Sequence, residues 1–354
     1  MIWKRLSLLL GSVLVSLVIS EIVLRSCVAR DAFLEHAPDE SWTVRLKSKT
    51  REESPHVDGR YGDVQLDPGL GWRMIPHHRS DGYTTNSRGY RGSAEYALGR
   101  RENGRRMVVI GDSFTQGFKV RDDETYCARM REHRPDVEIL NLGVNAYGTD
   151  QQLLLWKEEG ILYEPDVVLL GFYLPDFHRN ALRVREFPKP CFELDGEELR
   201  LTGTPVPPPE EVLEAYAAER RTRLRWLDVV RSVTHRARER VRPRSFERKS
   251  ALTSAIVREL NRSVKEIGAR LAIVLIPYRR IGERESDRQI VALLTDVTAR
   301  EGIPCLDLTE PLLEVAAETP DVVLYDPGHA HWTPAGHAIA AEHIVRFLEE
   351  VGAL

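Results

Sequence analysis

The chain has 354 residues, of which 42% are hydrophobic and 29% charged, a composition typical of a globular protein with one large domain or one domain with insertions. The formal net charge of -4 is too small to indicate a nucleic-acid partner. The four cysteines form no CxxC pair, which argues against a structural zinc site.

The chain begins with an apolar segment that predicts a transmembrane helix. A basic pair precedes an apolar run over residues 6–20, and with its flanks the segment reaches about 20 residues, enough to cross a bilayer. No small-residue cleavage site follows, and Arg25 stands where a lipoprotein signal before Cys27 needs a small residue. We therefore predict an uncleaved signal anchor over residues 1–29.

Residues 30–100 are polar and rich in glycine and proline, and we expect them to form an extension packed on the core. Within them, residues 67–72 predict turns around a buried Trp72, and residues 84–92 predict a structured loop ahead of the first strand. For both segments, a role in packing alone is the alternative to a role in function.

From Arg106 onward, apolar strand patterns alternate with helical patterns, which predicts a parallel sheet covered by helices on both faces. The expected strands are residues 107–110, 137–142, 167–172, 271–276 and 305–308, and the expected helices are residues 126–131, 150–159, 253–267, 287–299 and 334–351. An insertion at about residues 176–250 interrupts the alternation. Its arginine-rich stretch 220–249 is expected to be helical, and two roles stay open: a solvated lid, or a surface for anionic lipid or an acidic polymer.

The first predicted strand ends in Gly111-Asp112-Ser113. Open α/β sheets bind ligands at the carboxyl ends of their strands, and a helix N-terminus stabilises developing negative charge. Ser113 is therefore a candidate nucleophile. The alternative is a serine that only caps the following helix.

A second group of polar residues follows the last predicted strand and leads into the final helix. It contains Asp326, His329, His331 and His337, and it leaves the same edge of the sheet as Ser113. A serine nucleophile needs a base, and the base needs an acceptor that orients it. The alternatives are metal ligation by the histidines and ordinary polar loop contacts, but no matching carboxylate cluster for a metal occurs elsewhere.

Three stretches resemble the blocks of the SGNH/GDSL hydrolases: Gly111-Asp112-Ser113-Phe114, Asn141-Leu142-Gly143-Val144, and the stretch from His331 to His337. The loop from Asn86 to Gly92 resembles the region before the nucleophile in the membrane-anchored bacterial members. The likeness spans roughly residues 65–350 apart from the insertion. It implies a flavodoxin-like three-layer α/β/α sandwich with a central parallel five-stranded sheet, over a hydrolase domain of residues 101–354. It implies no cofactor and no metal.

The resemblance assigns the catalytic groups. Ser113 corresponds to the nucleophile and His331, directly before a tryptophan, to the base. The family's Asp-x-x-His spacing instead selects His329, which stays the alternative base. Asp326, or the backbone around His329, is expected to orient the base.

The resemblance also assigns the oxyanion hole, with one departure from the family pattern. The N–H groups of Ser113 and Gly143 are the expected backbone donors. Pro175 stands where the family places an asparagine. Asn180 is the expected substitute, with Asn145 as the alternative.

The implied function is a serine esterase that hydrolyses O-acetyl esters on a cell-envelope or extracellular polysaccharide through an acyl-enzyme. The implied setting is a bacterial cell membrane crossed once, with the catalytic domain outside the cytoplasm. Two alternatives stay open. An O-acyltransferase would use the same acyl-enzyme, and a non-catalytic polymer-binding protein would explain the missing asparagine.

Overall fold

The structure is a computed structural model that describes residues 2–27, 60–100, 103–222, 244–279 and 284–354, with Leu46, Thr50 and Thr234. Most of the arginine-rich stretch 220–249 lies outside the described residues. The chain forms two compact units. The larger comprises Pro55–Arg185, Lys189–Val206 and Arg248–Leu354, and the smaller comprises Met1–Ser54, Glu186–Pro188 and Pro207–Glu247.

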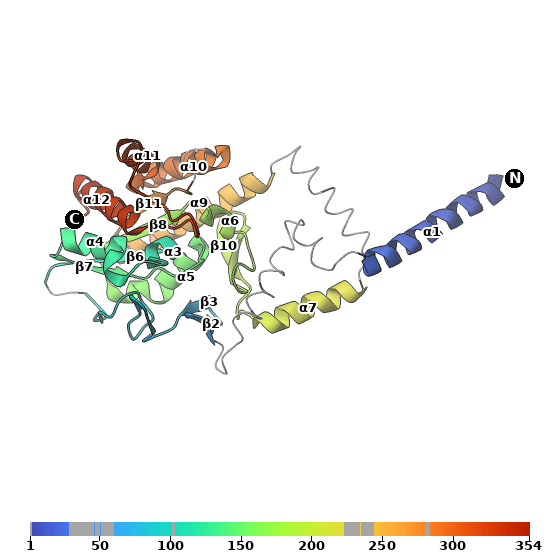
Figure 1. Ribbon diagram of the computed structural model, residues 1–354, viewed down its shortest axis with the longest axis horizontal. Helices are drawn as coiled ribbons and strands as arrows, with labels where there is room; N and C mark the ends of the chain where they lie inside the picture. The colour runs from blue at the N-terminus through green and yellow to red at the C-terminus, as the bar shows by residue number, and fades with distance from the viewer. Residues whose placement is uncertain are drawn as a thin grey trace. The chain divides into compact units, whose positions relative to one another are not determined.

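A five-stranded parallel sheet forms the centre of the larger unit (Figure 1). Its strands lie in the order β12 (Cys305–Asp307), β11 (Arg270–Ile276), β8 (Val167–Tyr173), β6 (Arg105–Gly111) and β7 (Val137–Asn141). Every residue of β8 is buried, which explains its unbroken apolar sequence. This order confirms the predicted flavodoxin-like sheet and places its switch point between the carboxyl ends of β6 and β8.

Helices cover both faces of the sheet, as predicted. Helices α4 (Tyr126–His133) and α12 (Pro334–Glu350) share one apolar cluster with the strands and lie side by side in Figure 1. Right-handed crossovers put α5 (Thr149–Glu158), α9 (Arg244–Glu266) and α10 (Glu285–Glu301) on the other face. Helix α11 (Thr309–Glu318), which the sequence analysis did not anticipate, adds Leu312 to the α4–α12 cluster.

The segment before β6 contains two small antiparallel sheets. One comprises β1 (Arg60–Tyr61), β2 (Val64–Asp67) and β3 (Gly71–Met74), and the other comprises β4 (Arg79–Ser80) and β5 (Tyr83–Thr84). Trp72 of β3 is 1% exposed. Its indole Nε1 donates to the Asn145 carbonyl at 3.0 Å, and its own carbonyl accepts from the Tyr147 hydroxyl. Strand β3 therefore supports the loop that follows β7.

The remaining described elements are short or belong to the insertion. The hairpin of β9 (Cys191–Asp195) and β10 (Glu198–Thr202) is antiparallel, and α7 (Pro209–Thr222) lies in the smaller unit. Three further short helices are η1 (Asp122–Glu124), η2 (Gly160–Tyr163) and α6 (Asp176–Arg179), and α3 (Ser113–Gln116) begins at the candidate nucleophile.

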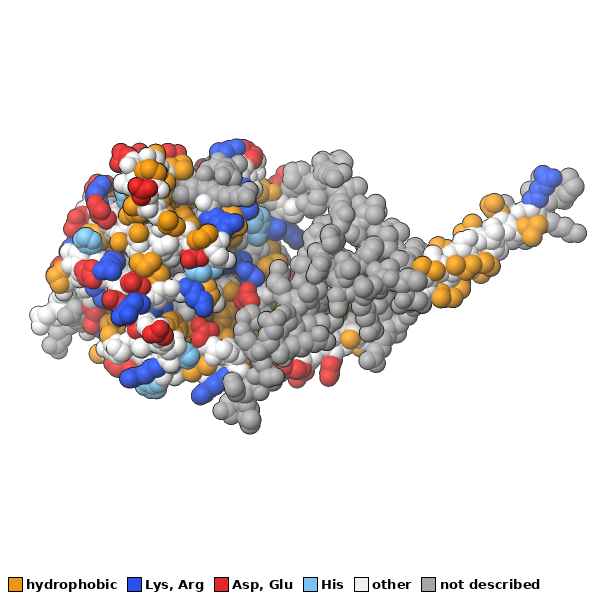
Figure 2. Space-filling view, in the orientation of Figure 1, with side chains coloured by type: hydrophobic (Ala, Val, Ile, Leu, Met, Phe, Trp, Pro, Cys, Tyr) orange, Lys and Arg blue, Asp and Glu red, His pale blue; other side chains and the backbone are white. Residues whose placement is uncertain are grey.

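The N-terminal segment is helical over α1 (Ile2–Cys27). Its apolar side chains are exposed along the helix (Figure 2), for example Leu8 at 73% and Leu14 at 65%. Within the described part of the chain, however, no helix combines the length and apolar character that crossing a bilayer requires. The transmembrane part of the prediction for residues 1–29 is therefore not supported.

Candidate active site

Ser113 lies at the turn from β6 into α3. Asp112 caps this helix by accepting a hydrogen bond from the Phe114 N–H at 2.9 Å. Gly111 ends the strand where no side chain fits, since a Cβ there would lie 1.9 Å from Thr115 Oγ1. Ser113 is 2% exposed, and its backbone N–H has no hydrogen-bond partner among the described residues. The turn therefore presents a buried hydroxyl beside an open backbone donor.

His331 is the histidine that reaches Ser113. Its Nε2 lies 2.8 Å from Ser113 Oγ, and its Nδ1 lies 2.9 Å from the carbonyl oxygen of His329. A carbonyl can only accept, so Nδ1 carries the proton and the Nε2 lone pair faces the serine. The rings of Phe114 and Phe118 pack at 5.0 and 4.8 Å from the imidazole. The geometry suits proton removal from Ser113.

The surroundings keep His331 neutral. Burial lowers the pKa of His331 below its usual range, because it penalises the charged imidazolium. The negative charge of Asp112 and the His329 carbonyl oppose this effect without overcoming it. An uncharged imidazole is the form that can accept the serine proton.

Asp326 is not an acceptor for the His331 ring. Its side chain is 41% exposed, and its Oδ1 accepts from the backbone N–H groups of Gly328 and His329. These bonds lower the pKa of Asp326. Its Oδ1 lies 3.5 Å from Nε2 of His329, whose ring forms no contact with Ser113 in the described structure. The carboxylate therefore organises the loop, and the backbone carbonyl of His329 orients the His331 ring.

Two of the predicted oxyanion donors are already occupied. The Gly143 N–H donates to Asn141 Oδ1 at 3.0 Å. The Asn180 amide donates to Thr253 Oγ1 at 3.1 Å, and its Oδ1 accepts from the Asp150 N–H. The Gly143 bond is local to its loop, whereas Asn180 joins α6 to α5 and α9, so neither group has its donor free.

The alternative donor Asn145 stays available. Its side chain is half-buried and makes no hydrogen bond with the described residues, while its carbonyl is held by Trp72. The next residue, Ala146, has φ 64°, a left-handed conformation uncommon for a residue with a side chain. The Ala146 N–H also lacks a partner within the described chain. The sequence pattern gave no indication that the Ala146 N–H would be an unpaired donor.

Arg179 is the polar residue near Ser113 that the sequence analysis missed. Its Nη1 lies 2.8 Å from Asp112 Oδ2, 2.8 Å from Asp176 Oδ1 and 3.0 Å from the Tyr147 carbonyl. Asp112 Oδ2 in turn lies 3.3 Å from Ser113 Oγ. The sequence pattern that could have pointed to Arg179 is its spacing three residues after Asp176, just beyond a buried strand, which favours an ion pair on one helix turn.

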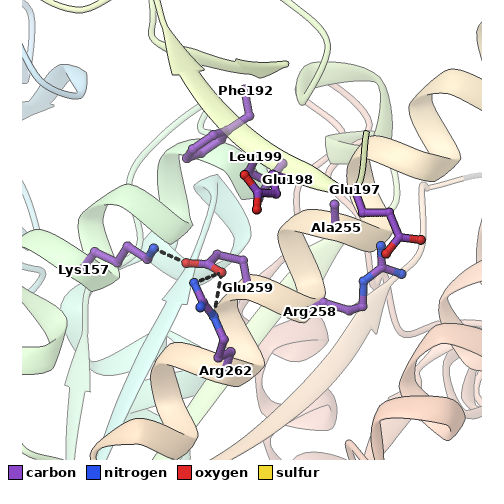
Figure 3. A pocket seen from close by; sticks show the side chains of 9 residues that line it. All are labelled: Lys157, Phe192, Glu197, Glu198, Leu199, Ala255, Arg258, Glu259 and Arg262. Carbon is purple, nitrogen blue, oxygen red and sulfur yellow. Dashed lines mark hydrogen bonds and ion pairs between the residues drawn. The ribbon is translucent and has the colours of Figure 1, made fainter. Parts of the chain in front are cut away.

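Two described cavities lie apart from Ser113. One of about 380 Å³ lies between the β9–β10 hairpin and α9 (Figure 3), where Glu259 already pairs with Lys157 and Arg262. The other, of about 550 Å³, is lined by residues after β8 and β11 and by α10 and α11. Neither is lined by Ser113 or His331. Among the described residues, no group of three or more His, Cys, Asp and Glu side chains could hold a metal ion.

The GDSL-like Lipase/Acylhydrolase family model matches residues 109–339, a stretch that includes both Ser113 and His331. Because this stretch is more than half of the chain, the protein belongs to that family. It is a hydrolase that acts on ester bonds.

No curated protein matches the chain. Among solved structures, a lipolytic protein of the G-D-S-L family from Desulfitobacterium hafniense is 11% identical, with 69% of this chain and 100% of that one covered and a TM-score of 0.42. A catalytic mutant of Axe2, an acetylxylan esterase from Geobacillus stearothermophilus, is 15% identical, with 70% and 95% covered and a TM-score of 0.43.

Proposed function

We propose that the protein is a serine esterase in which Ser113 and His331 act as a nucleophile and its general base. The observation that carries this proposal is the 2.8 Å contact between Ser113 Oγ and His331 Nε2. The serine oxygen attacks the ester carbonyl carbon while its proton passes to Nε2. His331 then returns this proton to the departing alcohol, and water releases the acyl group from Ser113 by the same route.

The tetrahedral intermediate needs donors for its negatively charged oxygen. The free N–H of Ser113 is one, as the sequence predicts. The free N–H of Ala146 replaces that of Gly143 as the second, because Gly143 is bound to Asn141. The Val144 N–H donates to the Gly111 carbonyl at 3.1 Å, which holds the Ala146 loop against the end of β6.

The proposed substrate is an O-acetyl ester on a cell-envelope or extracellular polysaccharide. Support comes from the resemblance to envelope-facing family members, and no cofactor takes part in the mechanism. An acyltransferase remains the second candidate because the same acyl-enzyme could pass its acyl group to a sugar hydroxyl.

We also propose that α1 holds the protein at a bacterial membrane, with the larger unit outside the cytoplasm. The exposed apolar side chains of α1 support this location. The full chain should float with phosphatidylglycerol-containing vesicles, whereas a chain lacking residues 1–29 should stay with the soluble fraction. Equal flotation of both chains would contradict the proposal.

The nucleophile is tested by fluorophosphonate labelling and p-nitrophenyl acetate turnover of the full chain beside Ser113→Ala. Wild-type protein should label and turn over, and the variant should do neither while keeping its melting temperature. Ser87→Ala, a serine whose hydroxyl donates to Glu95, is the control and should behave as wild type. A folded wild-type protein that does not label would overturn the esterase proposal.

A further inference from the structure

The oxyanion site lacks a side-chain donor at the position that follows β8. Pro175 has neither an N–H nor a polar side chain, and the Asn180 amide is bound to Thr253. A site that stabilises an anion with backbone N–H groups alone loses the contribution of one preorganised donor, about 10²–10³ in rate. Asn145, in the loop after β7, is one available side-chain donor, and the carboxyl end of β8 offers a second.

Arg179 lies at this position. It ends α6, the short helix that follows β8, and it is 9% exposed. All its hydrogen bonds with the described residues use Nη1, so its Nη2 and Nε donors have no protein partner there. Its guanidinium also packs 5.2 Å from the Tyr173 ring centroid. A nearly buried guanidinium therefore has free donors while it binds the carboxylate next to Ser113.

Arg179 is linked to Ser113 through the carboxylate of Asp112. The carboxylate of Asp112 is fully buried, and a negative charge 3.3 Å from Ser113 Oγ opposes the formation of a second one on the substrate. Arg179 neutralises it through the 2.8 Å contact with Oδ2. The other acidic neighbour, Asp176, competes less for this positive charge, because burial raises the pKa of Asp176 well above its usual range and favours its neutral form.

We propose that Arg179 is the side-chain donor of the oxyanion site: its guanidinium compensates Asp112 and presents its free N–H groups to the tetrahedral oxygen. This inference rests on the proposed esterase function. When Ser113 Oγ bonds to the carbonyl carbon, the carbonyl π electrons move to oxygen and the serine proton to His331. Arg179 stabilises that oxygen until the carbonyl re-forms and the bond to the leaving alcohol breaks, with the proton from His331 going to the alcohol.

The test compares Arg179→Met and Arg179→Lys with Arg106→Met in the full chain. Arg106 is the matched control because it is 3% exposed and paired with Glu138, but it lies at the amino end of β6, away from the site. For p-nitrophenyl acetate, Arg179→Met should lower kcat about 10²–10³-fold with KM changed less than about threefold. Arg179→Lys, which keeps the charge, should recover part of the loss, and Arg106→Met should keep the wild-type kcat.

A tetrahedral mimic separates stabilisation of the oxyanion from a merely structural role. Phenylboronic acid forms an anionic tetrahedral adduct with a serine oxygen, so its inhibition constant should rise in Arg179→Met by the same factor as kcat falls. Melting curves establish that each variant is folded. If Arg179→Met misfolds, Arg179→Lys is measured in the same way and should show a smaller change in the same direction.

Three results would overturn the inference while the esterase proposal stands. They are an Arg179→Met kcat close to wild type, a fall in kcat with unchanged boronate inhibition, and a full loss on Asn145→Ala with none on Arg179→Met. Failure of the esterase proposal looks different, since the wild-type protein itself would then show neither labelling nor turnover.

Discussion

His331 is held by a backbone carbonyl rather than by a carboxylate. The His329 oxygen fixes the tautomer as a carboxylate would, but it carries no full charge to stabilise the imidazolium that forms during the reaction. The main compensation comes from the buried Asp112, whose charge raises the pKa of His331. Under the proposed mechanism, Ser113 and His331 form a dyad supported by the loop backbone.

The first prediction concerns Asp326. In Asp326→Asn the Oδ1 acceptor for the Gly328 and His329 N–H groups is retained, so kcat/KM for p-nitrophenyl acetate should stay within about threefold of wild type. Where a carboxylate contacts the catalytic histidine, the same change costs about 10⁴. His331→Ala is the comparison, and its kcat/KM should fall at least about 10³-fold. A loss in Asp326→Asn as large as that of His331→Ala would show that Asp326 orients the base.

The second prediction is the pH dependence of the reaction. The base must be neutral, so kcat/KM is lost as pH falls through the pKa of His331. Because burial lowers that pKa, the acidic inflection should lie below the ordinary histidine value of about 6.5. Asp112→Asn removes a charge that raises the pKa and should move the inflection lower still. An inflection above pH 7, measured with p-nitrophenyl acetate, would contradict this account.

At the scale of elements, the small sheet of β1, β2 and β3 holds part of the candidate site. The Trp72 indole donates to the Asn145 carbonyl in the loop after β7, and the Tyr147 hydroxyl of the same loop donates to the Trp72 carbonyl. The rings of Trp72 and Tyr147 lie 5.4 Å apart in an edge-on arrangement. This loop carries the Ala146 N–H. The sequence pattern around Trp72 indicated burial, but hydrogen bonds between segments more than 70 residues apart leave no local pattern.

The third prediction tests this support. Trp72→Phe leaves the Asn145 carbonyl without its donor, which should lower the free energy of unfolding by about 1–3 kcal/mol and also lower kcat. Trp156→Phe is the matched control, since the Trp156 Nε1 donates to Ser263 Oγ at the same 3.0 Å but joins α5 to α9 rather than supporting the loop after β7. It should lose similar stability in urea unfolding and keep the wild-type kcat. Equal effects of both changes on kcat would argue against a role for β3 in the site.

At the scale of the whole molecule, a buried ion pair joins the start of the β9–β10 part of the insertion to α5. Lys189, just before the β9–β10 hairpin, is fully buried with Asp150 at the start of α5, and its Nζ also donates to the Arg179 carbonyl at 3.2 Å. Burial raises the pKa of Asp150, and Lys189 opposes that rise. Lys189 thus attaches the segment before β9 to α6, the short helix that carries Arg179.

The fourth prediction follows from this pair. Lys189→Met leaves an unpaired buried carboxylate, so at pH 8 the free energy of unfolding should fall by about 3–5 kcal/mol. The folded-state pKa of Asp150 then rises further, the folded state binds the extra proton, and stability should recover as pH is lowered from 8 to 5. Urea unfolding at both pH values measures this. Lys157→Met is the control: it removes a partly exposed pair with Glu259 and should lower the free energy of unfolding by less than about 1 kcal/mol. If Lys189→Met loses the same free energy of unfolding at pH 5 as at pH 8, the explanation is refuted.

The sequence by itself determined the central sheet and its covering helices, and it placed Ser113 at the same sheet edge as a loop in which both His329 and His331 stayed open as the base. A continuous apolar run predicts a buried strand. Short local motifs, Gly111-Asp112-Ser113 and His331-Trp332, indicated the candidate serine and one of the two candidate histidines. The tertiary structure decided which atoms pair: the His329 carbonyl with the base, Asn141 with Gly143, and Arg179 with an aspartate 67 positions earlier. The physical reason is that the hydrogen-bond partner of a polar group is set by residues that folding brings close to it. Hydrophobic periodicity, in contrast, is set by residues that are neighbours along the chain.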